Sequence, residues 1–85
     1  MTRDELRALI LDEVAAIAPE STAIPIGDDE DLREVLDLDS MDIFNLVVAL
    51  SARLGVDISE ADVGRLATLR GGVEHLQTAL AGKGA

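Results

Sequence analysis

The sequence predicts an all-α fold, a four-helix bundle in right-turning up-and-down order with a short third helix and a long loop between the first two helices. Apolar residues recur at helical spacing almost throughout, and few segments alternate in the manner of strands. Hydrophobic residues make up 48% of the chain, enough for a packed core despite a net charge of -10. With 85 residues, we expect a single domain, 1–85.

The first helix is predicted from Arg3 to Ala18. Thr2 and Glu5 have the spacing of a capping box, in which each side chain accepts a hydrogen bond from the other residue's backbone. Pro19 ends the helix because a proline pushes the preceding residue out of the helical region.

The long loop covers residues 19–38 and includes the acidic run 28–31. Loops of this length in small domains are usually functional or disordered. Spaced apolar residues predict an ordered loop that crosses the bundle, with one helical turn around 31–36.

The second helix is predicted to begin at Asp39 and Ser40 and to end at Leu54. Gly55 then supplies the left-handed residue that often follows a helix. Eight of the ten residues from 41 to 50 are apolar. A helix with so many apolar residues is either deeply buried or presents one face to a partner.

The third helix is predicted from Glu60 to about Leu66, with Ser59 as its N-cap and Asp62 completing a box-like pattern. A fourth helix follows, capped by Thr68. Glycines at 71 and 72 are expected to weaken its first turn.

We expect the tail, 82–85, to fray. The predicted core is aliphatic and consists of Leu6, Ile10, Val14, Val47, Leu50, Leu54, Ile58, Leu66, Val73, Leu76 and Leu80.

Composition excludes several classes of protein. Without cysteine there is no disulfide scaffold, thiolate zinc site or cysteine nucleophile. Seventeen acids against seven bases disfavour nucleic acids and anionic membranes as partners. The longest apolar runs are far shorter than a membrane span, and the charged N-terminus is unlike a signal peptide. We therefore expect a cytoplasmic monomer that neither binds nucleic acid nor inserts into membranes.

Asp39, Ser40 and Met41 stand after the long acidic loop and open the second helix. In this position they resemble the D-S-L-type motif of acyl carrier proteins. The likeness covers nearly the whole chain and includes 54–58 and 67–69. The sequence departs from the family pattern at Asp37, where glycine is common, and at Met41, where leucine is usual.

This resemblance implies an acyl-carrier-like fold and a non-catalytic carrier in which Ser40, flanked by Asp39 and Met41, receives 4′-phosphopantetheine from coenzyme A. Thioesters on that arm would serve a specialised lipid, fatty-acid or polyketide pathway. A separate phosphopantetheinyl transferase would install the arm, and acyl-loading and acyl-processing enzymes would be the other partners. The resemblance also implies a bundle that opens between its second, third and fourth helices to hold an acyl chain. A serine at a helix N-terminus suits a phosphodiester, because free N–H groups and the helix dipole favour negative charge there.

Asp42, Ile43, Phe44 and Val48 form the predicted docking surface for partner proteins. Typical fatty-acid carriers bear several acids on this helix, whereas Asp42 is its only acid after the motif here. Eight acids and one arginine lie between 28 and 42, a net charge of -7. We expect these acids to steer partners and apolar contact with the second helix to hold them. The alternative is that the acids are only solvated surface.

Other functions fit the residues less well. The main alternative is an unmodified small acidic helical adaptor that binds a partner through the second helix. The run 28–31 lacks the spacing of a calcium loop. His75 is the only histidine, and no G-x-S-x-G segment accompanies it. No catalytic residue and no metal ligand is therefore predicted.

Overall fold

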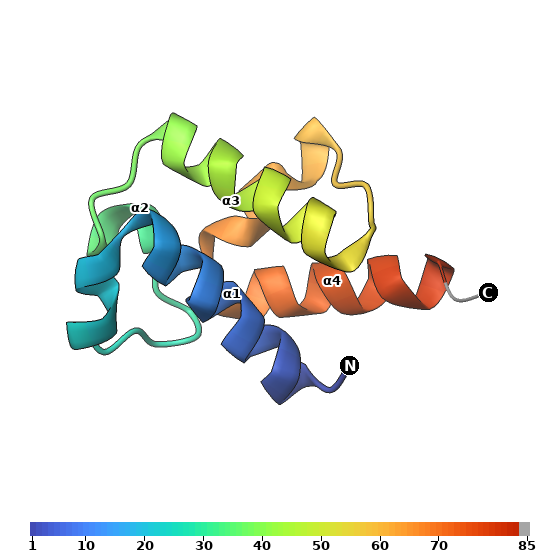
Figure 1. The fold of residues 1–85 in the computed structure, drawn as a ribbon, viewed down its shortest axis with the longest axis horizontal. Helices are drawn as coiled ribbons and strands as arrows, with labels where there is room; N and C mark the ends of the chain where they lie inside the picture. Colours follow the sequence, from blue (N-terminus) through green and yellow to red (C-terminus); the bar gives the residue numbers. More distant parts are fainter. Residues whose placement is uncertain (84–85) are drawn as a thin grey trace.

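The structure is a computed structural model that describes residues 1–83, apart from the side chains of residues 60 and 83. Within this range the chain is all-helical (Figure 1). The elements are α1 (Arg3–Ile17), η1 (Pro19–Ala23), α2 (Leu32–Val35), α3 (Ser40–Leu54), η2 (Glu60–Ala67) and α4 (Leu69–Lys83), where η marks a 3₁₀-helix. None of these described helices is both long and apolar enough to cross a lipid bilayer.

Two long helices, α3 and α4, pack against the third, α1. The 3₁₀-helix η2 lies against α3 and α4. Helices α3 and α4 run opposite to α1, and η2 brings the chain back between them (Figure 1). The predicted fold class, four helices in up-and-down order with a short third one, is confirmed.

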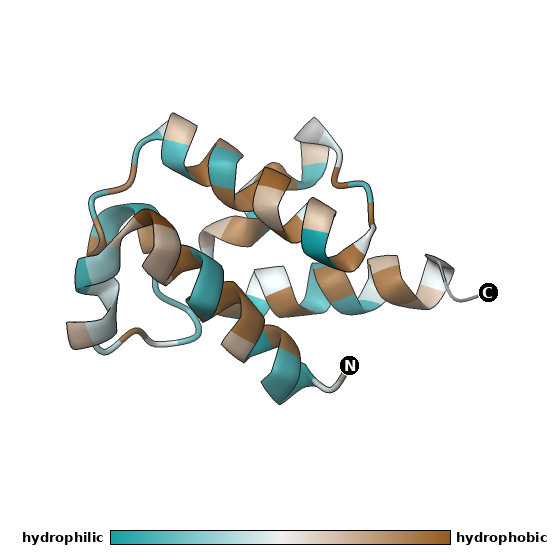
Figure 2. Cartoon of the chain, viewed as in Figure 1, coloured by the Kyte–Doolittle hydropathy of each residue, from teal (hydrophilic) through white to brown (hydrophobic). Residues whose placement is uncertain are grey.

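Apolar residues of α1, α3 and α4 gather where these helices approach one another (Figure 2). Eight of the predicted core residues are buried: Leu6, Ile10, Val14, Val47, Leu50, Leu66, Val73 and Leu76. The other three, Leu54, Ile58 and Leu80, are only partly buried and pack against the edge of this core. Leu32 and Leu36 also belong to it, so α2 fastens the long loop to the bundle.

Helix α1 starts with the predicted capping box. Thr2 Oγ1 accepts from the Glu5 N–H at 3.1 Å, and the Thr2 N–H donates to Glu5 Oε1 at 2.8 Å. The helix ends at Ile17, one residue before the predicted end, because Ala18 leaves the helical region before Pro19. The proline then opens η1, a turn that was not predicted.

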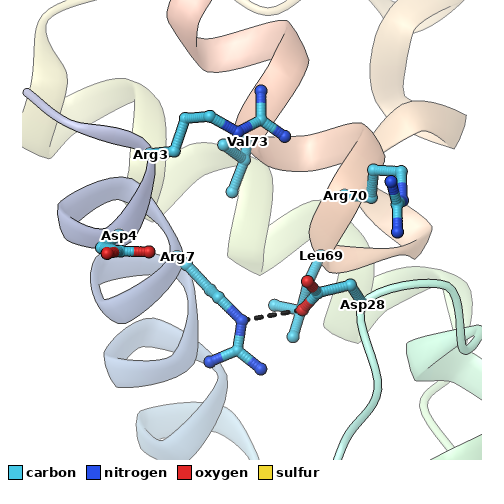
Figure 3. A pocket seen from close by; sticks show the side chains of 7 residues that line it. All are labelled: Arg3, Asp4, Arg7, Asp28, Leu69, Arg70 and Val73. Atoms are coloured by element: carbon cyan, nitrogen blue, oxygen red, sulfur yellow. Dashed lines mark hydrogen bonds and ion pairs between the residues drawn. The ribbon is translucent and has the colours of Figure 1, made fainter.

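Two arginines fix the acidic part of the long loop. Arg7 Nε lies 2.7 Å from Asp28 Oδ1 (Figure 3), and this hydrogen bond is the main cause of the lowered pKa of Asp28. Arg70 Nε lies 2.6 Å from Asp29 Oδ1, and the Arg70 N–H donates to the Asp28 carbonyl at 3.0 Å. The loop is therefore tied to α1 and to the first turn of α4.

The predicted short third helix is present over residues 60–67, one residue longer than expected, and it is a 3₁₀-helix. The Ser59 side chain does not cap this helix. Its hydroxyl donates to the Asp62 carboxylate at 2.9 Å. A 3₁₀-helix has three residues per turn, which places Val63 and Leu66 on one face, toward the core.

Gly71 and Gly72 have a packing role in the first turn of α4. Thr68 Oγ1 accepts from the Gly71 N–H at 3.0 Å, which confirms Thr68 as the cap. A Cβ on Gly71 would collide with the backbone carbonyl of Arg65, and one on Gly72 would press on Ile10. The glycines therefore allow η2 to lie directly on α4.

Helix α4 continues through Lys83 and so includes the first two residues of the predicted frayed tail. The other two, 84 and 85, lie outside the described residues.

Candidate functional site

The site lies at the N-terminus of α3. Asp39 has extended backbone and forms a reciprocal capping box with Asp42. Asp39 Oδ1 accepts from the Asp42 N–H at 2.9 Å, and Asp42 Oδ2 accepts from the Asp39 N–H at 3.2 Å. Asp39, and not Ser40, is thus the cap of this helix.

Because Asp39 supplies the cap, the hydroxyl of Ser40 is left free. Ser40 is the first residue of α3 and is exposed. Its Oγ has no hydrogen-bond partner among the described side chains and backbone groups. The helix dipole also places partial positive charge at this end of α3. A nucleophilic oxygen therefore faces solvent at a position that favours an attached anion.

A mostly apolar pocket of about 210 Å³ lies beside Ser40. Its lining comes from α2, α3 and η2 and consists of Arg33, Ser40, Ile43, Val63, Gly64 and Ala67. The resemblance implied an opening between the second, third and fourth helices. The pocket instead has a lining residue from α2 and none from α4. The lining residues other than Ser40 and Ile43 were not predicted as site residues, since no local pattern brings them together.

The loop enters α3 through a left-handed residue. Asp37 has φ of 53°, and it is the one non-glycine residue with positive φ in the described chain. The Leu38 N–H donates to the Arg33 carbonyl at 3.0 Å, which completes a Schellman-type end to α2. The glycine usual at this position would adopt the same conformation without steric cost. Asp37 therefore takes up the left-handed conformation that suits a glycine at this position.

The predicted docking residues divide into exposed and buried ones. Phe44 is 56% exposed and Val48 is 50% exposed, and Met41 joins them at 62%. Their spacing places all three along one side of α3. Ile43 is only 5% exposed, so its assignment to the docking surface was wrong. It points inward and lines the pocket beside Ser40.

Asp42, the remaining predicted docking residue, is half-buried, and its carboxylate accepts from the Asp39 N–H in the capping box. Farther along α3, a broad hollow adjoins the exposed apolar residues. Phe44, Val48 and Ile58 are among its lining residues. The apolar side of α3 therefore extends from Ser40 to the chain after the helix.

The acids around the site fall into two groups. Asp28, Asp29 and Asp31 each pair with an arginine: Arg7, Arg70 and Arg33, respectively. Arg33 also lowers the pKa of Asp31 through its hydrogen bond. Glu34 and Asp37 form no ion pair with a described side chain, and Asp39 and Asp42 bond only to backbone. Uncompensated negative charge therefore gathers next to Ser40.

His75 lies on α4, away from these residues. It is half-buried, and its Nε2 has no hydrogen-bond partner among the described atoms. No group of three or more potential metal-ligating side chains forms within residues 1–83.

The fold and the site define a class: a small helical domain that presents an unpaired serine hydroxyl at a helix N-terminus, beside an apolar pocket and an apolar helix face. Such an arrangement suits a covalently attached anionic group more than catalysis.

Comparison with known proteins supports the same class of protein. Residues 4–76 match the family described as phosphopantetheine attachment site. The chain is 35% identical to an acyl carrier protein of Streptomyces coelicolor over 78 residues, 92% of this chain and 80% of that protein. It is 35% identical over 52 residues to acyl carrier protein 2 of Pseudomonas aeruginosa, 61% of this chain and 66% of that protein. It is 28% identical over 74 residues to an acyl carrier protein of Chlamydia trachomatis, 87% of this chain and 90% of that protein.

The chain therefore belongs to the phosphopantetheine attachment site family. It is a non-catalytic acyl carrier protein, and its cofactor is covalently attached 4′-phosphopantetheine. The arm supplies a terminal thiol, so a protein without cysteine still carries thioesters.

Proposed function

We propose that Ser40 is the attachment site of the 4′-phosphopantetheine arm. One observation carries this assignment: Asp39 caps α3, and the exposed Ser40 hydroxyl has no competing hydrogen bond in the described structure. The N-terminal end of the helix favours the phosphodiester. The apolar pocket beside Ser40 offers a place for part of the attached arm.

The modification transfers phosphopantetheine from coenzyme A. Ser40 Oγ attacks the phosphorus next to the pantetheine, the O–P bond of the new phosphodiester forms, and the pyrophosphate bond breaks. Adenosine 3′,5′-bisphosphate leaves, and the hydroxyl proton is lost. We assign the activation of both groups to a separate, magnesium-dependent phosphopantetheinyl transferase, because no histidine is among the residues that line the pocket with Ser40.

We propose that the transferase and the acyl-loading and acyl-processing enzymes dock on the exposed side of α3. Phe44 and Val48, together with Met41, supply apolar contact. The unpaired acids Glu34 and Asp37 steer a basic partner surface toward Ser40. Charge steering thus comes from the acids next to the serine, because the run 28–31 is largely neutralised by arginines.

The cargo belongs to a specialised lipid, fatty-acid or polyketide pathway in the cytoplasm. This assignment rests on the apolar side of α3. Carriers of housekeeping fatty-acid synthesis typically have acids on this helix, whereas Phe44 and Val48 are its large exposed apolar residues after the motif.

Intact-mass measurement tests the attachment site. The wild-type chain, incubated with coenzyme A and a broad-specificity transferase, should gain one phosphopantetheine. Ser40→Ala should gain none, and Ser51→Ala, a control on the same helix, should be modified like the wild type. An unmodified wild-type chain would favour the alternative of an adaptor that binds a partner through α3.

A further inference from the structure

The phosphodiester proposed for Ser40 would sit among negative charges. Asp39 and Asp42 lie within two residues of Ser40, and Asp37 is three residues before it. Their carboxylates repel a phosphodiester, and the helix dipole offsets only part of this repulsion. A cation close to Ser40 would lower the electrostatic cost of the attached arm.

Arg33 is the cation best placed for this role. It is the one charged residue that lines the pocket with Ser40. Arg33 Nε and Nη2 bond to Asp31 at 3.2 Å and 3.0 Å. Its Nη1 has no hydrogen-bond partner among the described atoms, and the side chain is 53% exposed. One edge of the guanidinium is thus held by Asp31, whereas Nη1 stays unbonded in the described structure.

The chain also holds Arg33 at this point through its backbone. The Arg33 N–H donates to Asp31 Oδ1 at 2.9 Å at the start of α2, and the Arg33 carbonyl accepts from the Leu38 N–H at 3.0 Å in the turn before α3. The same turn therefore sets the position of Arg33 and of Ser40.

We propose that Arg33 is a positioning residue for the arm: its free guanidinium edge binds the phosphodiester on Ser40 and directs the pantetheine along the pocket. This inference rests on the proposed attachment at Ser40. A planar guanidinium with two parallel N–H groups suits phosphate oxygens. Asp31 competes for the same cation, so it weakens the contact without abolishing it.

Phosphorus NMR of the modified protein tests the proposal. Arg33→Gln should move the phosphodiester resonance toward its position in the unfolded chain, and Arg33→Lys should restore part of the shift because it keeps the charge. Asp31→Asn should move the resonance the other way, since it frees Arg33 and asparagine still caps α2. The matched control is Arg65→Gln. Arg65 adjoins the lining residue Gly64 but does not line the pocket.

A rate measurement accompanies the spectra. We expect Arg33→Gln to lower the kcat/KM for modification about two- to fivefold, the range of an exposed ion pair, and Arg65→Gln to leave it unchanged. A resonance that Arg33→Gln does not move, or that Arg65→Gln moves equally, overturns the proposal. Failure of the wild-type chain to accept the arm would instead overturn the assignment of Ser40.

Discussion

The Nε atom of Arg70 lies 2.6 Å from Oδ1 of Asp29, although 41 residues separate the two in the sequence. The backbone N–H of Arg70 also donates to the Asp28 carbonyl. Together these contacts join the long acidic loop to the first turn of α4. Part of the acidic run therefore serves to hold the loop against α4.

We expect Arg70→Gln to lower the Tm at low salt and to make it rise more steeply with added salt than in the wild type. The substitution leaves Asp29 unpaired in a chain of high negative charge, and salt screens the resulting repulsion. Thermal unfolding at several salt concentrations measures this. Arg53→Gln is the control, because Arg53 pairs with Glu13 away from the loop. Equal salt dependence in all three proteins would contradict the assigned role of Arg70.

Gly71→Ala should destabilise the protein by about 1–3 kcal/mol, the usual cost of overpacking. The new Cβ would collide with the Arg65 carbonyl, which is backbone and has little room to move. Gly82→Ala is the control in the same helix. It meets no neighbouring atom, so it should stabilise the protein by up to about 1 kcal/mol through helix propensity. Urea unfolding measures the free energy of unfolding of both variants. Equal changes in Gly71→Ala and Gly82→Ala would refute the packing role of Gly71.

Asp37→Gly should leave the free energy of unfolding within about 0.5 kcal/mol of the wild type. Relief of the left-handed conformation offsets the extra entropy of glycine in the unfolded chain. Asp37→Val should cost about 1–2 kcal/mol, because a β-branched residue fits positive φ poorly. The control is Asp57→Gly, at an exposed aspartate with ordinary φ. It should lower the free energy of unfolding by about 0.5–1 kcal/mol. If Asp37→Gly lowered the free energy of unfolding as much as Asp57→Gly, the aspartate side chain itself would be needed at position 37.

Ile43→Ala and Phe44→Ala should affect different properties. Ile43→Ala should cost about 2–4 kcal/mol, because Ile43 is buried. Phe44→Ala should change stability by less than about 0.5 kcal/mol and should slow acyl transfer by a partner enzyme. Chemical unfolding and a loading assay on the modified protein separate the two effects. Unchanged transfer in Phe44→Ala would remove Phe44 from the docking surface.

Lowering the pH should remove the stabilisation of the fold by the ion pair between Arg7 and Asp28. The hydrogen bond from Arg7 lowers the pKa of Asp28 below its ordinary value of 3.8. A carboxyl with a depressed folded-state pKa stabilises the fold above its unfolded pKa and loses this effect as the pH falls through the folded value. The stability difference between the wild type and Asp28→Asn should therefore be constant above about pH 5 and should shrink below pH 3.8.

Urea unfolding of both proteins between pH 6 and pH 2.5, about the range over which carboxylates protonate, measures this difference. The comparison cancels the general relief of acidic repulsion that both proteins share. A difference that does not change with pH would refute the stabilising role of the pair.

Local signals in the sequence were sufficient for the long helices. The capping box of Thr2 and Glu5, the proline at 19 and the glycine at 55 predicted ends that the structure reproduces within a residue. Such signals succeed because capping and left-handed turns depend on neighbours a few residues apart.

Short elements were harder to predict. The region 60–67 has helical spacing, but its 3₁₀ type and its packing against α3 and α4 appear only in the structure. The glycines at 71 and 72 looked unfavourable for α4 and proved to be contact points with η2 and α1. Packing partners that lie far away in the sequence decide these features.

The amino-acid order alone therefore determined the fold class, the limits of α1 and α3 and the motif at Ser40, because each depends on residues close together in the chain. Only the tertiary structure decided that Ile43 is buried while Phe44 is exposed, that arginines neutralise much of the acidic loop, and that Arg33 shares a pocket with Ser40. These relationships join separate helices, and the packing of apolar faces around a common core sets them.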